Sequence, residues 1–227
     1  MAGFLVEIRL HGYAKEYAKE TIYSVAKKYR VRGATRKKVV PHISLYGPGE
    51  AINLRKVIST IEKVGKKYTL VPFEIKGFGS FETKPKVIYF DIESSQELET
   101  LRWELSQELR KISSCQPWDS QKKHHFHATI AFKDIDYKFN KIWPYLKNKE
   151  EPHIKQYLTR ITVLGHGRRI VCEYDLILKR LLNRNESLNR VLRRKTMVKL
   201  REIQGLPPEQ PPSTKNWLQK LLDLLNQ

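Results

Sequence analysis

The sequence has little cysteine, few acidic residues and no long apolar run, and each shortage excludes a class of protein. Its two cysteines, Cys115 and Cys172, form no Cys-x-x-Cys motif, which disfavours a disulfide scaffold and indicates a reducing interior. No apolar run reaches the roughly 20 residues of a membrane span. Residues 1–4 lack the basic segment and apolar core of a secretory signal. We therefore expect a soluble cytoplasmic protein.

The shortage of acidic residues leaves the chain strongly basic. Its 43 Lys and Arg residues outnumber 24 Asp and Glu, and the formal net charge is +19 over 227 residues. This charge favours a polyanionic partner, either nucleic acid or an anionic membrane surface. A solvated basic surface without a partner is the simpler alternative. The length allows one large domain or two small lobes.

Two stretches share the pattern His-x-Ser/Thr followed by an apolar residue. They are His42-Ile43-Ser44-Leu45 and His127-Ala128-Thr129-Ile130. Both read as strands. Because side chains alternate between the two faces of a strand, the histidine and the hydroxyl of each motif share a face, and the spacer points to the packed side.

Two such pairs facing one groove would supply an acid, a base and two hydroxyl donors. One neutral imidazole would remove a proton from the attacking oxygen, and the other, protonated, would deliver one to the departing oxygen. Ser44 and Thr129 would donate to the non-bridging oxygens. The sequence leaves open which histidine is the base. A single motif is more often structural, but two copies on matching strands predict a metal-free site for phosphoryl transfer.

Apolar periodicity predicts the same order of strands and helices in each half of residues 1–178. We expect strands over 4–10, 40–46, 73–76, 87–92, 125–131, 158–164 and 170–178, and helices over 14–29, 54–66, 96–112 and 139–146. Matching landmarks lie 83, 85 and 88 residues apart: Phe4 and Val87, His42 and His127, Gly77 and Gly165. These offsets predict an internal duplication, with repeats about 3–82 and 83–178.

Residues 179–227 differ in character and are predicted to form a basic helical extension. Between 179 and 204 there are nine Lys or Arg and two Glu with a loose apolar stripe, which predicts one or two basic amphipathic helices. A Pro-rich linker follows at 207–212, and Ser213 or Thr214 could cap a last helix. Three interpretations are open: an RNA-binding appendage, a dimerisation element, or a strap packed on the core, which is the simplest.

The paired motifs resemble the 2H phosphoesterase superfamily, and within it the RNA 2′,3′-cyclic phosphodiesterases, also called 2′-5′ RNA ligases. Pro41, the stretch 73–81, Pro85 before 87–90 and the strand 174–178 support the resemblance, which covers roughly residues 3–178. It implies an α+β fold in two duplicated lobes, with two mainly antiparallel sheets, helices outside and both motifs in a central cleft. It implies no metal or cofactor, opening of cyclic phosphates to 2′-phosphates, and in some members slow 2′-5′ joining.

Five further residues are candidates for substrate binding. Family members often carry an arginine shortly after the second motif, where this chain has Phe132 and then Lys133. Tyr46 could stack on a terminal base or pack in the core. Arg36 and Lys38 could hold the RNA backbone or lie in a solvated loop.

The remaining candidate is His125, in the run His124, His125 and His127. Such a run could bind a metal, but no cysteine or carboxylate lies close in sequence to complete the set. We therefore expect no metal, and expect His125 to bind phosphate or to orient His127.

The leading hypothesis is an RNA 2′,3′-cyclic phosphodiesterase that acts on RNA ends, with tRNA processing or repair as one setting. Its enzymatic rival cleaves 2′-5′ or 3′-5′ linkages in oligoribonucleotides. A different class is a non-catalytic module that binds RNA or nucleotides. Attachment of the basic tail to a membrane surface is a third.

Overall fold

Strands and helices alternate along the first half of the chain and again along the second. The computed structural model describes residues 1–31, 35 and 39–207. Its strands are β1 (Ala2–Arg9), β2 (His42–Ala51), β3 (Pro72–Phe81), β4 (Val87–Ser94), β5 (His127–Phe132), β6 (His153–Tyr157), β7 (Arg160–Leu164), β8 (Ile170–Asp175) and β9 (Arg180–Asn183). Its helices are α1 (Gly12–Tyr29), α2 (Leu54–Gly65), α3 (Gln96–Leu109), α4 (Phe139–Lys147), α5 (Arg184–Leu188) and α6 (Arg190–Ile203). Short 3-10 turns are η1 (Pro117–Ser120) and η2 (His166–Arg168).

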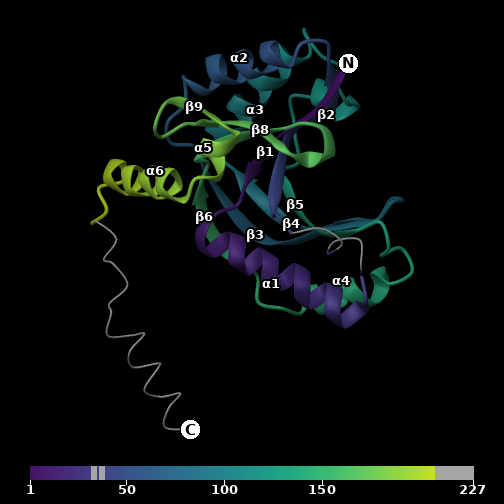
Figure 1. The fold of residues 1–227 in the computed structure, drawn as a ribbon. Helices are drawn as coiled ribbons and strands as arrows, with labels where there is room; N and C mark the ends of the chain where they lie inside the picture. The colour runs from purple at the N-terminus through teal and green to yellow at the C-terminus, as the bar shows by residue number, and fades with distance from the viewer. Residues whose placement is uncertain (32–34, 36–38, 208–227) are drawn as a thin grey trace.

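The nine strands of the described residues form one antiparallel sheet, in the order β6-β3-β4-β5-β2-β1-β7-β8-β9 (Figure 1). The α+β class is therefore confirmed, and the expectation of two sheets is wrong. The physical reason is one contact: β2 pairs with β5 at Ile43 and Ala128. That pair joins strands that the sequence divides between two lobes.

The strand order is the same on both sides of this β2–β5 contact. Outward from it, the order is β5-β4-β3 on one side and β2-β1-β7 on the other. The landmarks of the sequence repeat relate β1 to β4, β2 to β5 and β3 to β7. The strand β3 and its counterpart β7 each pair with a strand of the other repeat, β3 with β4 and β7 with β1. The seam between the two halves therefore lies between the two histidine strands.

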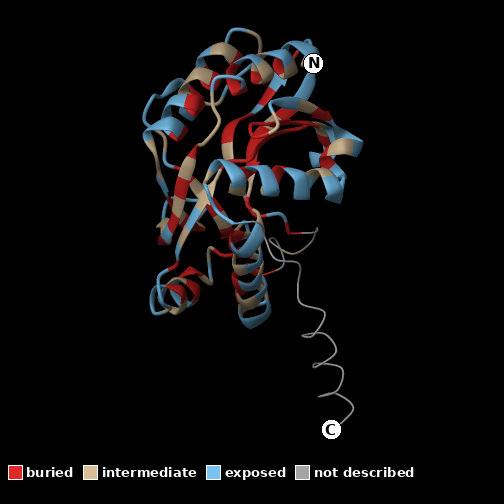
Figure 2. Ribbon diagram, turned by 90° about the vertical axis from the view of Figure 1, so that its left-hand side faces the viewer, coloured by how far each residue is buried: buried red, intermediate tan, exposed pale blue. Residues whose placement is uncertain are grey.

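Helices cover the sheet and close the hydrophobic core. Helices α1 and α4 lie beside the half that contains β3 and β5, and α2 and α3 lie beside the half that contains β2 and β8 (Figure 1). Ser95 begins α3 by accepting a hydrogen bond from the Leu98 amide at 3.2 Å. Buried residues follow the strands and the inner helix faces (Figure 2). Ile43 and Ala128 belong to this core, so the histidine-bearing face of their strands points away from it.

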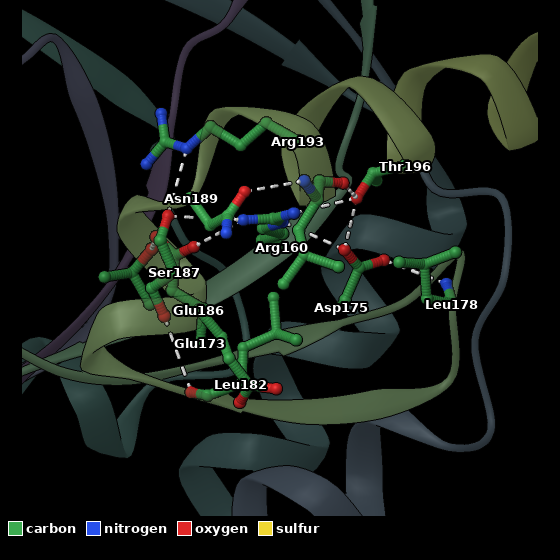
Figure 3. A network of polar contacts seen from close by, with 12 residues as sticks. Arg160, Glu173, Asp175, Leu178, Leu182, Glu186, Ser187, Asn189, Arg193 and Thr196 are labelled. Carbon is green, nitrogen blue, oxygen red and sulfur yellow. Dashed lines mark hydrogen bonds and ion pairs between the residues drawn. The ribbon is translucent and has the colours of Figure 1, made fainter.

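Residues 179–207 pack on the sheet instead of forming only helices. The strand β9 pairs with β8 at the sheet edge, and Leu182, predicted to line a helix, is fully buried there. Helices α5 and α6 follow and contact β7 and β8 through the buried side chain of Arg160 (Figure 3). The described part of the tail is thus packed on the core. The linker beyond Pro207 and the expected last helix lie outside the described residues.

No helix within these ranges is both long enough and apolar enough to cross a membrane.

Candidate active site

The two histidine motifs are neighbours in the sheet. Ile43 of β2 lies opposite Ala128 of β5, and both are buried, with 0% and 1% exposure. In an antiparallel pair this register sets His42 across from Thr129 and Ser44 across from His127. Facing side chains in such pairs have Cβ atoms about 4.5–5.5 Å apart. Each imidazole therefore lies beside the hydroxyl of the other motif.

Both imidazoles are oriented by the same backbone contact. Nδ1 of His42 lies 2.8 Å from the carbonyl oxygen of Val40, and Nδ1 of His127 lies 3.1 Å from that of His125. Because a carbonyl oxygen only accepts, Nδ1 carries the proton in each neutral ring. The other nitrogen, Nε2, then holds the lone pair that can take a proton. The two motifs thus present the same reactive atom.

Aromatic side chains enclose His127 on one side. Its ring lies 5.3 Å from Phe81, nearly perpendicular to it, and 5.1 Å from Tyr89. Burial lowers the pKa of His127, and the positive charges of His125 and His42 lower it further, against the hydrogen bond to the His125 carbonyl. His127 is therefore neutral at pH 7 and suited to accept a proton.

A carboxylate instead lies beside His42. Nε2 of His42 is 3.7 Å from Oε2 of Glu7, whose side chain is 2% exposed. Arg9 donates from Nε to the other Glu7 oxygen at 2.7 Å. The two histidines therefore have different electrostatic surroundings.

One residue of each motif, His42 and Thr129, lines a cleft with a volume of about 690 Å³ together with Lys133. Their partners Ser44 and His127 lie beside it and are not among the residues that line it. Lys133 directly follows β5, with φ at 74°, a left-handed conformation that is uncommon outside glycine. The cleft also receives basic side chains from β1, η2 and α5: Arg9, Arg168, Arg169 and Arg184. Glu7 is the sole acidic residue among the described residues that line it. The cleft is therefore suited to bind phosphate.

His125 is half exposed, and its Nε2 lies 3.2 Å from Oδ1 of Asp91. It orients His127 through its backbone carbonyl. Neighbouring His124 is half-buried and contacts the backbone of Ser44; its partial burial first, then the charge of Arg102, lowers its pKa to about 4.

The proposed stacking role of Tyr46 is corrected by its position. Tyr46 is 1% exposed, stacks on Phe4 and bonds through its hydroxyl to Ser113 Oγ and the Ser114 carbonyl, each at 3.0 Å. A ring enclosed in this way has no face to offer a base. Arg36 and Lys38 lie outside the described residues.

Sequence reasoning missed several cleft residues. Arg168 and Arg169 follow the Gly165-His166-Gly167 turn, so a basic pair directly after a repeat landmark was the available signal. For Glu7 the signal was a carboxylate inside an otherwise apolar strand. Arg184 had no local signal, because its place in the cleft depends on how the tail folds back.

A family model described as the 2′-5′ RNA ligase superfamily matches residues 16–169. Among solved structures, a phosphoesterase aligns at 16% identity and a TM-score of 0.48, over 73% of this chain and 88% of that one. Escherichia coli LigT complexed with 3′-AMP aligns at 16% identity and 0.44, over 72% and 87%. Kluyveromyces marxianus Usb1 aligns at 10% identity and 0.47, over 80% and 97%. No curated protein matches the chain. Since the family model spans more than half of the sequence and includes both histidine motifs, the chain belongs to the 2′-5′ RNA ligase superfamily of 2H phosphoesterases.

Proposed function

We propose that this protein is an RNA 2′,3′-cyclic phosphodiesterase that opens terminal cyclic phosphates to 2′-phosphates by two-histidine acid–base catalysis. The observation that carries the proposal is the pairing of Ile43 with Ala128. It sets both histidine–hydroxyl pairs side by side on one face, with Nε2 as the reactive atom of each ring. Membership of the superfamily supports the same chemistry.

The lowered pKa of His127 supports assigning it as the base and His42 as the acid. His127, whose pKa is lowered by burial, takes a proton from water through Nε2. The water oxygen bonds to phosphorus as the bond from phosphorus to the ribose O3′ breaks. His42, which lies beside Glu7, acts as the acid and gives a proton from Nε2 to O3′. The product carries a 2′-phosphate and a 3′-hydroxyl.

The hydroxyls and cations would stabilise the pentacoordinate transition state. Ser44 and Thr129 donate to the non-bridging oxygens as their negative charge increases. Lys133 and Arg168 line the same cleft, and their positive charges would favour the dianionic phosphorane. With the 5′-hydroxyl of a second RNA in place of water, the same roles join the two ends through a 2′-5′ bond: His127 takes the proton of the 5′-hydroxyl, and His42 gives a proton to O3′ as its bond to phosphorus breaks.

The test is turnover of a short RNA with a 2′,3′-cyclic end, in the presence of a chelator, followed by product analysis. We expect a 2′-phosphate end from the wild type. His42→Ala and His127→Ala should each lower kcat about 100- to 10 000-fold. His153→Ala is the matched control, since His153 is exposed on β6 and bonds to Glu74. Full turnover by the double variant His42→Ala and His127→Ala would refute the mechanism.

The same assay separates the rival functions. Release of nucleotides from uncyclised 2′-5′ or 3′-5′ oligoribonucleotides, with cyclic ends left intact, would replace the proposal with an oligoribonucleotide phosphodiesterase. Tight RNA binding without any turnover would identify a binding module.

A further inference from the structure

A second basic groove, outside the catalytic cleft, runs along α6. It has a volume of about 530 Å³ and lies between α6, the start of α1 and β6. Five cationic side chains line it: Lys15, Lys155, Arg193, Arg194 and Arg201. The described lining contains no Asp or Glu. Helix α6 lies beyond residues 16–169, which the family model matches.

Helix α6 is held rigidly, so the groove is preformed. Arg160, from β7, donates from Nη2 to Thr196 of α6 at 2.8 Å and from Nε to Asp175 at 2.9 Å. Thr196 and Leu200 are 2% and 3% exposed. Asn189 caps the helix by accepting from two amides of its first turn. Figure 3 shows this network beneath the helix.

The network also neutralises two acidic side chains, so that they do not offset the positive charge of the groove. Glu173 and Asp175 are both buried and are paired with Arg160. Arg193 donates through Nε to the Ser187 carbonyl at 3.1 Å, and its terminal nitrogens extend past the network (Figure 3). Lys15 pairs with Glu16 on the surface, where an ion pair is worth little. The groove therefore keeps a net positive charge.

The groove lies close to the catalytic cleft. A small hollow of about 90 Å³ separates them. Arg9 lines both the cleft and this hollow, while His11 and Arg193 line both the hollow and the groove. Arg9 and His11 are two residues apart at the end of β1, about 7 Å along an extended chain. A strand of nucleic acid that leaves the cleft past Arg9 therefore has the groove within a short distance along its path.

We propose that the α6 groove binds the sugar–phosphate backbone of the RNA that precedes the terminal cyclic phosphate. This rests on the proposed function and names its substrate class: a single-stranded oligoribonucleotide rather than a nucleoside cyclic phosphate. A single strand is flexible enough to follow the short path from the cleft to the groove, and a line of cations binds successive phosphates without reading bases. The described part of the tail is then both packed on the core and part of the substrate site.

The test compares two charge-reversal variants of the full chain. Lys155→Glu with Arg194→Glu reverses two exposed cations of the groove. The control pairs Lys195→Glu with Lys147→Glu; both positions are exposed, and neither lines the groove. Both variants change the net charge equally. Binding is measured by fluorescence anisotropy with a single-stranded RNA of roughly ten nucleotides, over a series of salt concentrations.

The groove variant should bind the RNA about tenfold more weakly than the control at low salt, and its slope of log affinity against log salt should fall by about 1 to 1.5. It should raise KM for an oligonucleotide with a cyclic end, and leave kcat/KM for a nucleoside 2′,3′-cyclic phosphate within about twofold of wild type.

Equal effects of the two variants on RNA binding would overturn the proposed role of the groove, because the loss of affinity would then reflect net charge alone. Equal loss on oligonucleotide and nucleoside substrates would overturn it too. Preferential loss of binding to phosphatidylserine vesicles, with RNA binding unchanged, would assign the groove to a membrane surface instead. If the wild type turns over neither substrate, the proposed function fails. The anisotropy comparison still decides whether the groove binds RNA.

Discussion

Ile43 lies directly opposite Ala128, in the pair where β2 and β5 join the two halves of the sheet. Each residue is the spacer of a His-x-Ser/Thr motif, and both point into the core. The position that fixes the fold therefore also fixes the site, because burying the two spacers turns both histidines and both hydroxyls to the same opposite face.

Overpacking this pair should affect activity and stability together. Ala128→Leu adds three carbons where the side chain is 1% exposed, and we expect it to lower the free energy of unfolding by about 1–3 kcal/mol. Because it moves β2 relative to β5, it should also lower kcat in the folded protein. Urea unfolding and turnover below the transition measure the two effects. A wild-type kcat in the destabilised variant would show that the contact between β2 and β5 does not position the catalytic side chains.

The acid limb of the pH profile for kcat/KM should lie below pH 6.5. Burial lowers the pKa of His127 from its usual value of 6.5, so this base stays neutral and active to a more acidic pH. Phe81→Ala removes a ring 5.3 Å from His127, and should move the limb toward pH 6.5 by hydrating the imidazole.

The matched control for this prediction is Phe78→Ala, in the same strand, whose ring packs on Phe90. It should leave the acid limb in place. An acid limb above pH 6.5 in the wild type would exclude His127 as the base.

His124 should make the protein less stable as the pH falls from 6.5 to about 4. Its pKa is about 4 in the folded state because of burial, against 6.5 for an exposed histidine. Between these values the unfolded chain binds the proton and the folded chain does not, so the free energy of unfolding falls on acidification. The slope ends near pH 4, where both states are protonated.

His124→Gln should flatten this part of the stability curve, measured by urea unfolding at several pH values. His153→Gln, at an exposed position, should leave the curve unchanged. Parallel curves for wild type and His124→Gln would contradict the prediction.

Arg160→Met should be strongly destabilising, by about 3–5 kcal/mol, because it leaves two buried carboxylates without their partner. Those carboxylates belong to Glu173 and Asp175. Arg180→Met is the control; it breaks an exposed ion pair with Glu186, which is expected to cost less than about 1 kcal/mol. Chemical denaturation measures both, and equal effects would show that the network contributes no more than a surface pair.

Period-2 alternation is a local signal, and it correctly predicted which side chains of the two motifs share a face. It failed at Tyr46, because the β1–β2 pairing shifts register between Phe4 and Glu7. Leu45, Tyr46 and Gly47 are then buried in succession, so the alternation that links His42 to Ser44 does not extend to the tyrosine.

Long-range pairing explains the other differences. The joining of two sheets into one rests on a single pair between residues 43 and 128, which neither segment encodes alone. Leu182 fits a helical stripe, but the edge of β8 offers unpaired backbone groups and it becomes part of a strand. Arg184 enters the cleft only as a consequence of that pairing.

A crystal structure with vanadate, a mimic of the phosphorane, would test directly whether the two motifs act on one phosphorus atom. We expect vanadate between the strands β2 and β5, within hydrogen-bond distance of Nε2 of both His42 and His127, with Ser44 and Thr129 donating to its oxygens. Vanadate bound to the cleft arginines alone, with either imidazole out of reach, would contradict the two-histidine mechanism.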